Sequence, residues 1–293
     1  MLKVVPQFFF DKPDTFPHLY HDFSSCILYK KLDTTNQQSD YFLSTHLLTI
    51  IIKGSKIIRT YEGEQIIVRE NEMILMPKDL YMVQDIIADK EQFESWLFFI
   101  SDEVIGKFLD YQRQSGINGY RFPNKESAVI PMFNKTKIID HFTDNILSSF
   151  PLLGNQSDQL VTMKLQELLQ LMSLSDQRDE FYAAISSIGK KQRNVKILME
   201  THFDKPLRVE DYATLAGRSL TSFQRDFKKM YGTSPKQWLM TRRMEKSRDL
   251  LEKANYSVTR AAYESGYENI SHFIKAFKKQ FGITPGQYAG NSE

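Results

Sequence analysis

A stretch of twelve residues occurs twice near the C-terminal end of the chain, and this repeat constrains the fold more than any other feature. Residues 227–238 read FKKMYGTSPKQW and residues 277–288 read FKKQFGITPGQY, with six identical positions. In each copy a glycine ends one helix, because glycine adopts the left-handed conformation at little cost. A Ser-Pro or Thr-Pro pair with a following Gln then begins the next helix as a capping box. The repeat therefore predicts two copies of the same helix–turn–helix segment.

The helix before each of these glycines is predicted to be amphipathic, with a basic outer side. On a helical wheel, one side of each helix gathers large apolar residues. These apolar sides comprise Leu220, Phe223, Phe227, Met230 and Tyr231 in the first copy and Ile270, Phe273, Phe277 and Phe281 in the second. The opposite sides comprise Thr221, Arg225, Lys228, Lys229, Ser271, Lys275, Lys278 and Lys279, with Ser222, Gln224 and His272 beside them. Each helix is therefore expected to bury one side and to present a cationic side to a partner.

A second shared element lies upstream of each basic helix. Ala213 precedes Gly217 by four residues, and Ala262 precedes Gly266 by the same interval. A small residue lets a neighbouring helix approach closely and the glycine turns the chain, which is the plan of a helix-turn-helix motif. The helix predicted at 235–253 joins the two motifs. Two basic helices held in this way could enter successive major grooves of a duplex, roughly 34 Å apart.

The chain from Val195 onward is predicted to be helical throughout. Helical periodicity and capping residues define seven candidate helices in this part of the sequence. They span residues 195–202, 209–216, 221–231, 235–253, 258–265, 270–281 and 285–289. Helices joined by such short turns predict a compact all-α domain.

Charge is distributed unevenly between the two parts of the chain. The net charge of the 293 residues is only +2. From Lys190 onward, however, 20 basic and 11 acidic residues give +9, and the residues before it carry −7. A basic module fused to an acidic one indicates that the C-terminal part binds a polyanion and that the N-terminal part has another task.

The paired turns, the two FKK segments and the stretch AAYESGYENISHFIKAFKKQFGITPGQY (261–288) resemble the DNA-binding domain of AraC/XylS-type transcription regulators. The resemblance covers residues 195–289. It implies a sequence-specific DNA-binding regulator, with activation as the expected outcome and RNA polymerase as an expected partner. It also implies an N-terminal cupin-like β-barrel that senses an effector or mediates dimerisation.

The exposed side chains of the two basic helices are expected to have two roles. Residues near the helix starts point into the groove and can read bases, as arginine reads guanine and glutamine reads adenine. This group comprises Thr221, Ser222, Gln224, Arg225, Ser271, His272 and Lys275. The remaining cations suit phosphate contact, which releases counterions without reading sequence. This group comprises Lys228, Lys229, Lys236, Arg242, Arg243, Lys278 and Lys279.

The first half of the chain has the pattern of an antiparallel β domain. Short runs rich in β-branched and aromatic residues are separated by frequent turn signals, which predicts an antiparallel barrel or sandwich. The predicted strands span residues 47–53, 56–61, 65–69, 72–76, 80–87 and 93–100. Helices are predicted at 103–114, 134–150 and 157–174. The predicted fold class is therefore α+β, with a β-barrel domain and its helical extension over 1–175, a linker over 176–193 and a DNA-binding domain over 194–293.

The helix predicted at 157–174 has a wide apolar side, and two interpretations of it are open. Its side chains Leu165, Leu168, Leu169 and Met172 could form a helix-to-helix contact in a homodimer. The same side chains could instead pack against the β domain as part of its core.

Signatures of an enzyme or a cofactor site are missing from the sequence. His18, His21 and His46 are scattered and the strands over 50–100 contain no histidine, so no metal site is predicted. The sequence contains neither a nucleophile-elbow motif nor a glycine-rich phosphate loop. Four aromatic residues either line an effector pocket or fill the core: Tyr81, Phe93, Trp96 and Phe98.

With one cysteine and no long apolar segment, the chain is expected to act in the cytoplasm, without a disulfide framework or a membrane span. The expected partners are double-stranded DNA, RNA polymerase, a small-molecule or protein effector and a second copy of the chain, and no cofactor is expected. Two other functions stay open. One is a cupin-type enzyme with a DNA-binding tail, and the other is an architectural protein that binds DNA without sequence preference.

Overall fold

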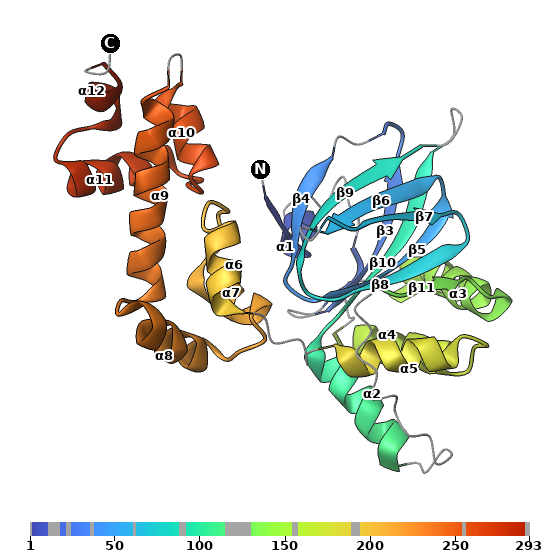
Figure 1. Cartoon of the computed structure of the whole chain (residues 1–293). Helices are drawn as coiled ribbons and strands as arrows, with labels where there is room; N and C mark the ends of the chain where they lie inside the picture. Colours follow the sequence, from blue (N-terminus) through green and yellow to red (C-terminus); the bar gives the residue numbers. More distant parts are fainter. Residues whose placement is uncertain are drawn as a thin grey trace. The chain divides into compact units, whose positions relative to one another are not determined.

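The structure is a computed structural model of the chain. It describes residues 2–10, 18–21, 25–35, 38–60, 63–87, 92–114, 130–153, 158–188, 194–253 and 256–290. The chain divides into two compact units, one of residues 3–190 and one of residues 191–293 together with residues 1–2 (Figure 1). We call them the N-terminal unit and the C-terminal unit. Strands occur in the first and helices in both, so the predicted α+β class is confirmed.

Two β-sheets form the framework of the N-terminal unit. The five-stranded sheet has the order β1 (Lys3–Val5), β4 (Ser39–Leu43), β9 (Leu80–Ile86), β6 (Ser55–Thr60) and β7 (Gln65–Arg69). The six-stranded sheet has the order β11 (Met132–Asn134), β8 (Glu72–Met76), β5 (His46–Lys53), β10 (Phe93–Ile100), β3 (Cys26–Leu32) and β2 (His18–His21). All strand pairs are antiparallel except β1 with β4. The described strands of the two sheets share no ladder of hydrogen bonds, so the predicted antiparallel β domain consists of two packed sheets and the barrel is not closed.

The predicted strands match β5 to β10 to within one residue at each end. The strands before β5 and the short helix α1 (Gln7–Phe10) were not predicted. Strand β3 was missed because it contains Lys30. A hydrophobicity pattern counts a lysine as a surface residue, but the Lys30 side chain is buried, with 2% exposed.

Three buried charged groups lie among the apolar side chains between the two sheets. Lys30 on β3 donates to the carboxylate of Asp85 on β9 at 2.5 Å, and Lys56 on β6 donates to the other oxygen of the same carboxylate. Lys56 stands directly opposite Asp85 in the strand register. All three side chains are at most 5% exposed. Because β3 belongs to one sheet and β6 and β9 to the other, Asp85 links the two sheets through Lys30.

A second core lies between the six-stranded sheet and four helices, which Figure 1 shows gathered near β8, β10 and β11. The helices are α2 (Asp102–Gln114), α3 (Lys137–Leu153), α4 (Asp158–Ser173) and α5 (Arg178–Ser187). Leu165, Leu168, Leu169 and Met172 on α4 are at most 1% exposed and belong to this core. The core interpretation of this helix is therefore correct, and the dimer contact expected for the four side chains is not, because the chain itself covers them.

Helix α5 lies inside the stretch 176–193 that was predicted to be a linker. Its Phe181 packs edge-on against Phe108 of α2 and Phe133 of β11, with ring centroids 6.0 and 6.3 Å apart. The surrounding polar residues give the segment a linker-like composition although its apolar residues are buried. The helix therefore belongs to the N-terminal unit, which extends to Lys190.

The four aromatic residues considered for an effector pocket fill the cores instead. Trp96 and Phe98 lie in the core under the helices, and Tyr81 and Phe93 lie in the core between the sheets. A cavity of about 20 Å³ remains between the sheets, lined by apolar side chains together with Lys30 and Lys56 among others. That volume is close to what one water molecule requires.

His46 is held by hydrogen bonds inside the N-terminal unit. Its Nε2 lies 2.8 Å from Asp102 Oδ1, and its Nδ1 accepts from the Lys78 backbone N–H at 3.2 Å. Burial lowers the pKa of His46, which favours a neutral ring in this position. Within the described ranges, no group of three or more His, Cys, Asp or Glu residues could hold a metal ion. No helix in these ranges combines the length and the apolar character needed to cross a membrane.

The described part of the C-terminal unit is helical. Its helices are α6 (Val195–His202), α7 (Val209–Leu215), α8 (Leu220–Tyr231), α9 (Pro235–Leu251), α10 (Val258–Glu264), α11 (Ile270–Phe281) and α12 (Pro285–Gly290). Each predicted helix of this part is present, with ends within two residues of those predicted. In Figure 1, α9 forms the axis of the unit, with α6, α7 and α8 at one end and α10, α11 and α12 at the other.

Candidate nucleic-acid interface

Each basic helix begins and ends with the local signals that the repeat predicts. Ser219 caps α8 and Asn269 caps α11, and each side chain accepts a hydrogen bond from the N–H three residues on. Gly232 and Gly282 follow the two helices with φ angles of 71° and 80°. This left-handed conformation satisfies the last carbonyls of a helix and is strained for other residues. Short-range sequence therefore determines where α8 and α11 start and stop.

The inner sides of α8 and α11 are buried in two aromatic clusters of the same design. In the first, Phe227 stacks on Tyr231 with ring centroids 4.5 Å apart and meets Trp238 of α9 edge-on at 5.8 Å. The ring of Phe277 lies 4.6 and 5.7 Å from the two aromatic rings at the equivalent positions of the second copy. Each cluster joins a basic helix to the helix that follows it, so both basic helices are held by large apolar contacts.

The outer sides of both helices are exposed. The exposed members of the predicted DNA-binding set are Thr221, Gln224, Arg225, Lys228, Lys229, Lys236, Arg242, Ser271, His272, Lys275, Lys278 and Lys279, and Ser222 is partly buried among them. Leu220 and Met230 were assigned to the apolar side of α8 but are 36% and 52% exposed. Leu220 is the first residue of the helix and Met230 the last but one.

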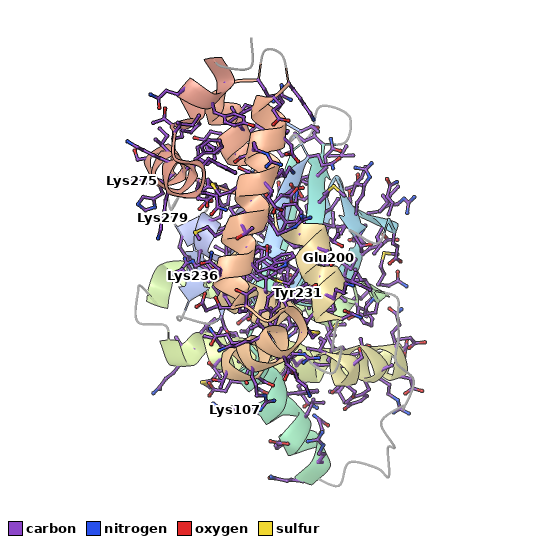
Figure 2. All side chains as sticks on the ribbon, turned by 60° about the vertical axis from the view of Figure 1, so that its left-hand side comes forward. Lys107, Glu200, Tyr231, Lys236, Lys275 and Lys279 are labelled. Carbon is purple, nitrogen blue, oxygen red and sulfur yellow. The ribbon has the colours of Figure 1, made fainter. Side chains whose placement is uncertain are left out.

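Helix α9 sets the separation of the two basic helices. It has 17 residues and is therefore about 25 Å long. Figure 1 shows α8 and α11 at its two ends, both running across it. In Figure 2 the labelled lysines of α9 and α11, which are Lys236, Lys275 and Lys279, lie along one side of the unit.

Arg243 has a structural position rather than the exposed one expected for a phosphate contact. Its Nε donates to the carbonyl of Phe203 at 2.7 Å, and its Nη2 donates to the carbonyls of Lys205 and Leu207 at 2.5 and 3.0 Å. The guanidinium thus binds the 203–207 turn to α9 through these hydrogen bonds. Its neighbour Arg242 is exposed and pairs with a carboxylate of its own helix at 3.0 Å. The hydrogen bonds to the 203–207 turn occupy Arg243 in place of the phosphate contact that was expected for it.

Two charged residues beside the outer side of α8 were not among the predicted site residues. Asp226 lies within the helix and Arg218 in the turn before it, and Arg218 Nη1 donates to Asp226 Oδ2. The other carboxylate oxygen of Asp226 accepts from Arg225 Nε at 3.3 Å. A single acidic residue inside an otherwise basic helix face is the sequence signal that could have indicated this arrangement. The equivalent position of α11 is Ala276, so the second copy has no counterpart of the carboxylate.

Two family models match this chain. One, described as a helix-turn-helix domain, matches residues 212–291, and the other, described as the ExsA N-terminal regulatory domain, matches residues 46–184. Together they cover about three quarters of the chain and fall on different units. The chain belongs to the AraC/XylS-type regulators. The family resemblance predicted from the repeat is thereby confirmed.

The relatives of this AraC/XylS-type regulator are transcription regulators. It is 28% identical over 246 residues to the thermoregulatory protein LcrF of Yersinia pestis, covering 82% of this chain and 87% of that one. It is 25% identical to the virulence regulon transcriptional activator VirF of Yersinia enterocolitica, covering 74% of this chain and 79% of that one. A crystal structure of apo ToxT from Vibrio cholerae matches 92% of this chain and 98% of that one, with 13% identity and a TM-score of 0.45.

Proposed function

We propose that this AraC/XylS-type regulator activates transcription by placing α8 and α11 in successive major grooves of a specific DNA sequence. Two exposed cationic helices, held at the two ends of α9, support this proposal most directly. The relative VirF is a transcriptional activator, which favours activation over repression. Recruitment of RNA polymerase is the step by which we expect the bound protein to activate, and the cytoplasm is the compartment in which we expect it to act.

The proposed contacts divide into base reading and phosphate binding. Base reading is assigned to the exposed or partly buried residues near the helix starts: Thr221, Ser222, Gln224, Arg225, Ser271, His272 and Lys275. Phosphate binding is assigned to the exposed cations Lys228, Lys229, Lys236, Arg242, Lys278 and Lys279. Arginine can bind guanine through two parallel hydrogen bonds and lysine offers only a point charge, so the first motif is proposed to supply more of the selectivity.

The N-terminal unit is proposed to be the regulatory half, which its match to a regulatory domain supports. The cavity that the described residues form between its sheets has a volume of about 20 Å³, which is room for about one water molecule. The partner proposed for this unit is a small-molecule effector, a protein or a second copy of the chain. No enzymatic activity is part of the proposal, since the relatives above are regulators.

Replacing Arg225 by Ala is expected to relax sequence selectivity more than replacing Lys275 by Ala. Loss of a bidentate arginine–guanine contact should cost about 1–3 kcal/mol at one base pair and little at the others. The measurement is selection of bound sequences from a random duplex library, followed by affinity measurements on single-base variants of the selected site.

Lys196→Ala on α6 is the matched control, because Lys196 is an exposed cation of the same unit outside both motifs. It should leave the base preference unchanged. If Arg225→Ala and Lys275→Ala weaken binding equally on every sequence, neither side chain reads bases. If the wild-type chain binds duplex DNA and enriches no sequence, the protein is an architectural binder.

A further inference from the structure

We propose that Asp226 is a positioning residue that raises the DNA selectivity of the first motif by holding Arg218 and Arg225 on one carboxylate. The proposal rests on the proposed function and adds two residues to it. Asp226 would not touch DNA itself. It would restrain two cations beside the groove, so that they leave the carboxylate only for a site that offers them better hydrogen bonds.

The geometry places one acidic group between two arginines. Arg218 Nη1 donates to one oxygen of Asp226, and Arg225 Nε donates to the other oxygen at 3.3 Å. Arg225 is held at a second point, because its Nη2 donates to the Ser222 hydroxyl at 3.3 Å. Both carboxylate oxygens are therefore engaged, and the guanidinium of Arg225 is directed by two neighbours on its own helix.

The exposure of these groups argues against a purely structural ion pair. The side chain of Asp226 is 30% exposed, that of Arg218 is 26% exposed and that of Arg225 is 75% exposed. The accessible pair is that of Arg225 with Asp226, and an ion pair of this kind adds little to folding stability. The Nε of Arg218 is buried and has no hydrogen-bond partner among the described residues. The cluster therefore keeps Arg225 at the surface, and Arg218 is partly buried beside it.

The net charge of the cluster of Arg218, Arg225 and Asp226 explains how it could discriminate between DNA sequences. Two arginines and one aspartate carry a net charge of +1, and loss of the carboxylate would leave +2 beside the phosphates. Free cations bind any duplex, because phosphates are present at every step of DNA. A guanine with its two acceptors can compete with a carboxylate for Arg225, whereas a single phosphate contact gains less over the existing pair. Asp226 would thus weaken binding to the wrong sequences.

The second motif offers an internal comparison. At the positions equivalent to Arg218, Arg225 and Asp226 it has Glu268, Lys275 and Ala276. The described part of that motif therefore lacks a carboxylate between two cations. The effect of Asp226 should be confined to the base pairs that contact α8.

The test compares Asp226→Asn with the wild-type full-length chain on two DNA probes. One probe is a duplex selected by the wild-type protein from a random library, and the other is a duplex of scrambled sequence. We expect Asp226→Asn to bind the scrambled duplex more tightly and the ratio of selected to scrambled affinity to fall by about tenfold. The dependence of scrambled binding on salt should become steeper by about one unit of slope, because one more phosphate contact forms.

Asp249→Asn is the matched control. Asp249 is an exposed aspartate on α9 that pairs with the neighbouring Arg248 at 3.1 Å, so this variant makes the same change of charge in the same unit. It should leave the affinity ratio unchanged. Asp226→Glu, which keeps the carboxylate, should retain most of the wild-type ratio of selected to scrambled affinity. In an Arg218→Gln background the effect of Asp226→Asn on the salt slope should shrink, because one of the two restrained cations is already gone.

The possible failures can be told apart. If the wild-type chain enriches no sequence, the proposed function fails and the role of Asp226 fails with it. If the wild-type chain enriches a sequence and Asp226→Asn behaves as Asp249→Asn does, only the role of Asp226 is overturned. A purely structural role would instead lower the thermal stability of Asp226→Asn and weaken binding to both probes, and that result would also overturn the proposal.

Discussion

Replacing Asp85 by Asn is expected to destabilise the N-terminal unit by about 3–5 kcal/mol, because it removes the carboxylate shared by two buried ammonium groups. Lys30 and Lys56 are each at most 5% exposed and both donate to Asp85. A buried charge that loses its counter-charge keeps the full cost of leaving water. The substitution changes side-chain volume very little, so the loss can be assigned to charge rather than to a cavity.

The measurement can use the two tryptophans of the chain, since Trp96 lies in the N-terminal unit and Trp238 in the C-terminal unit. In a Trp238→Phe background, urea unfolding followed by fluorescence reports the N-terminal unit alone. Asp110→Asn is the control, because Asp110 is 64% exposed and forms only a surface pair with Arg113. Its effect should stay below about 1 kcal/mol.

The stabilisation by Asp85 is also expected to depend on pH. Burial alone would raise the pKa of Asp85, but the attraction of Lys30 and Lys56 outweighs burial and holds the pKa below its usual range. The stabilisation is therefore complete above the unfolded carboxyl pKa of about 4 and is lost as the pH falls further. Asp85→Asn should flatten this part of the acid unfolding curve. An unchanged curve together with a loss below 1 kcal/mol would show that the three charges are not coupled.

Replacing Arg243 by Ala is expected to destabilise the C-terminal unit by about 3 kcal/mol or more and to abolish DNA binding where the unit unfolds. Three backbone carbonyls of the 203–207 turn lose a charged donor at once. Hydrogen bonds to charged groups contribute about 1.5–3 kcal/mol each, and bonds from one guanidinium are not additive. Fluorescence of Trp238 in a Trp96→Phe background measures the loss.

Arg242→Ala is a close control, since it removes the adjacent arginine from the exposed side of the same helix. It should change stability by less than about 1 kcal/mol and weaken DNA binding on all sequences. Gly266→Ala tests the same contact between α9 and the 203–207 turn, from a residue of the second motif. Gly266 has a φ of +87°, and a Cβ there would lie 2.8 Å from the Asp204 carbonyl and 3.1 Å from Arg243 Nε. Equal stability of Arg243→Ala and Arg242→Ala would contradict the structural role of Arg243.

The C-terminal helices could be predicted closely because their ends depend on short-range signals. The ends of α8 and α11 are determined by local hydrogen bonds and backbone conformation at Ser219, Gly232, Asn269 and Gly282. The burial of Phe227 and Phe277 likewise follows from helical periodicity alone.

The incorrect predictions concern side chains whose burial depends on contacts between residues far apart in the sequence. The apolar side of α4 is the same whether a second chain or the chain's own sheet covers it, so Leu165 could not be assigned from periodicity. Arg242 and Arg243 are adjacent and chemically identical, and only the position of the 203–207 turn separates an exposed cation from a structural one. The buried Lys30 has a partner, Asp85, that lies 55 residues away, which no local pattern reveals.

Helix α9 is continuous, and this constrains the DNA sequence that the protein can recognise. A helix is stiff along its axis, so the two motifs cannot slide apart to follow a target whose halves are separated by a variable number of base pairs. Each inserted base pair would move the halves about 3.4 Å apart and rotate one relative to the other by about 34°. Promoters that share this regulator should therefore keep one invariant interval between the two parts of its recognition sequence, even where the intervening bases differ.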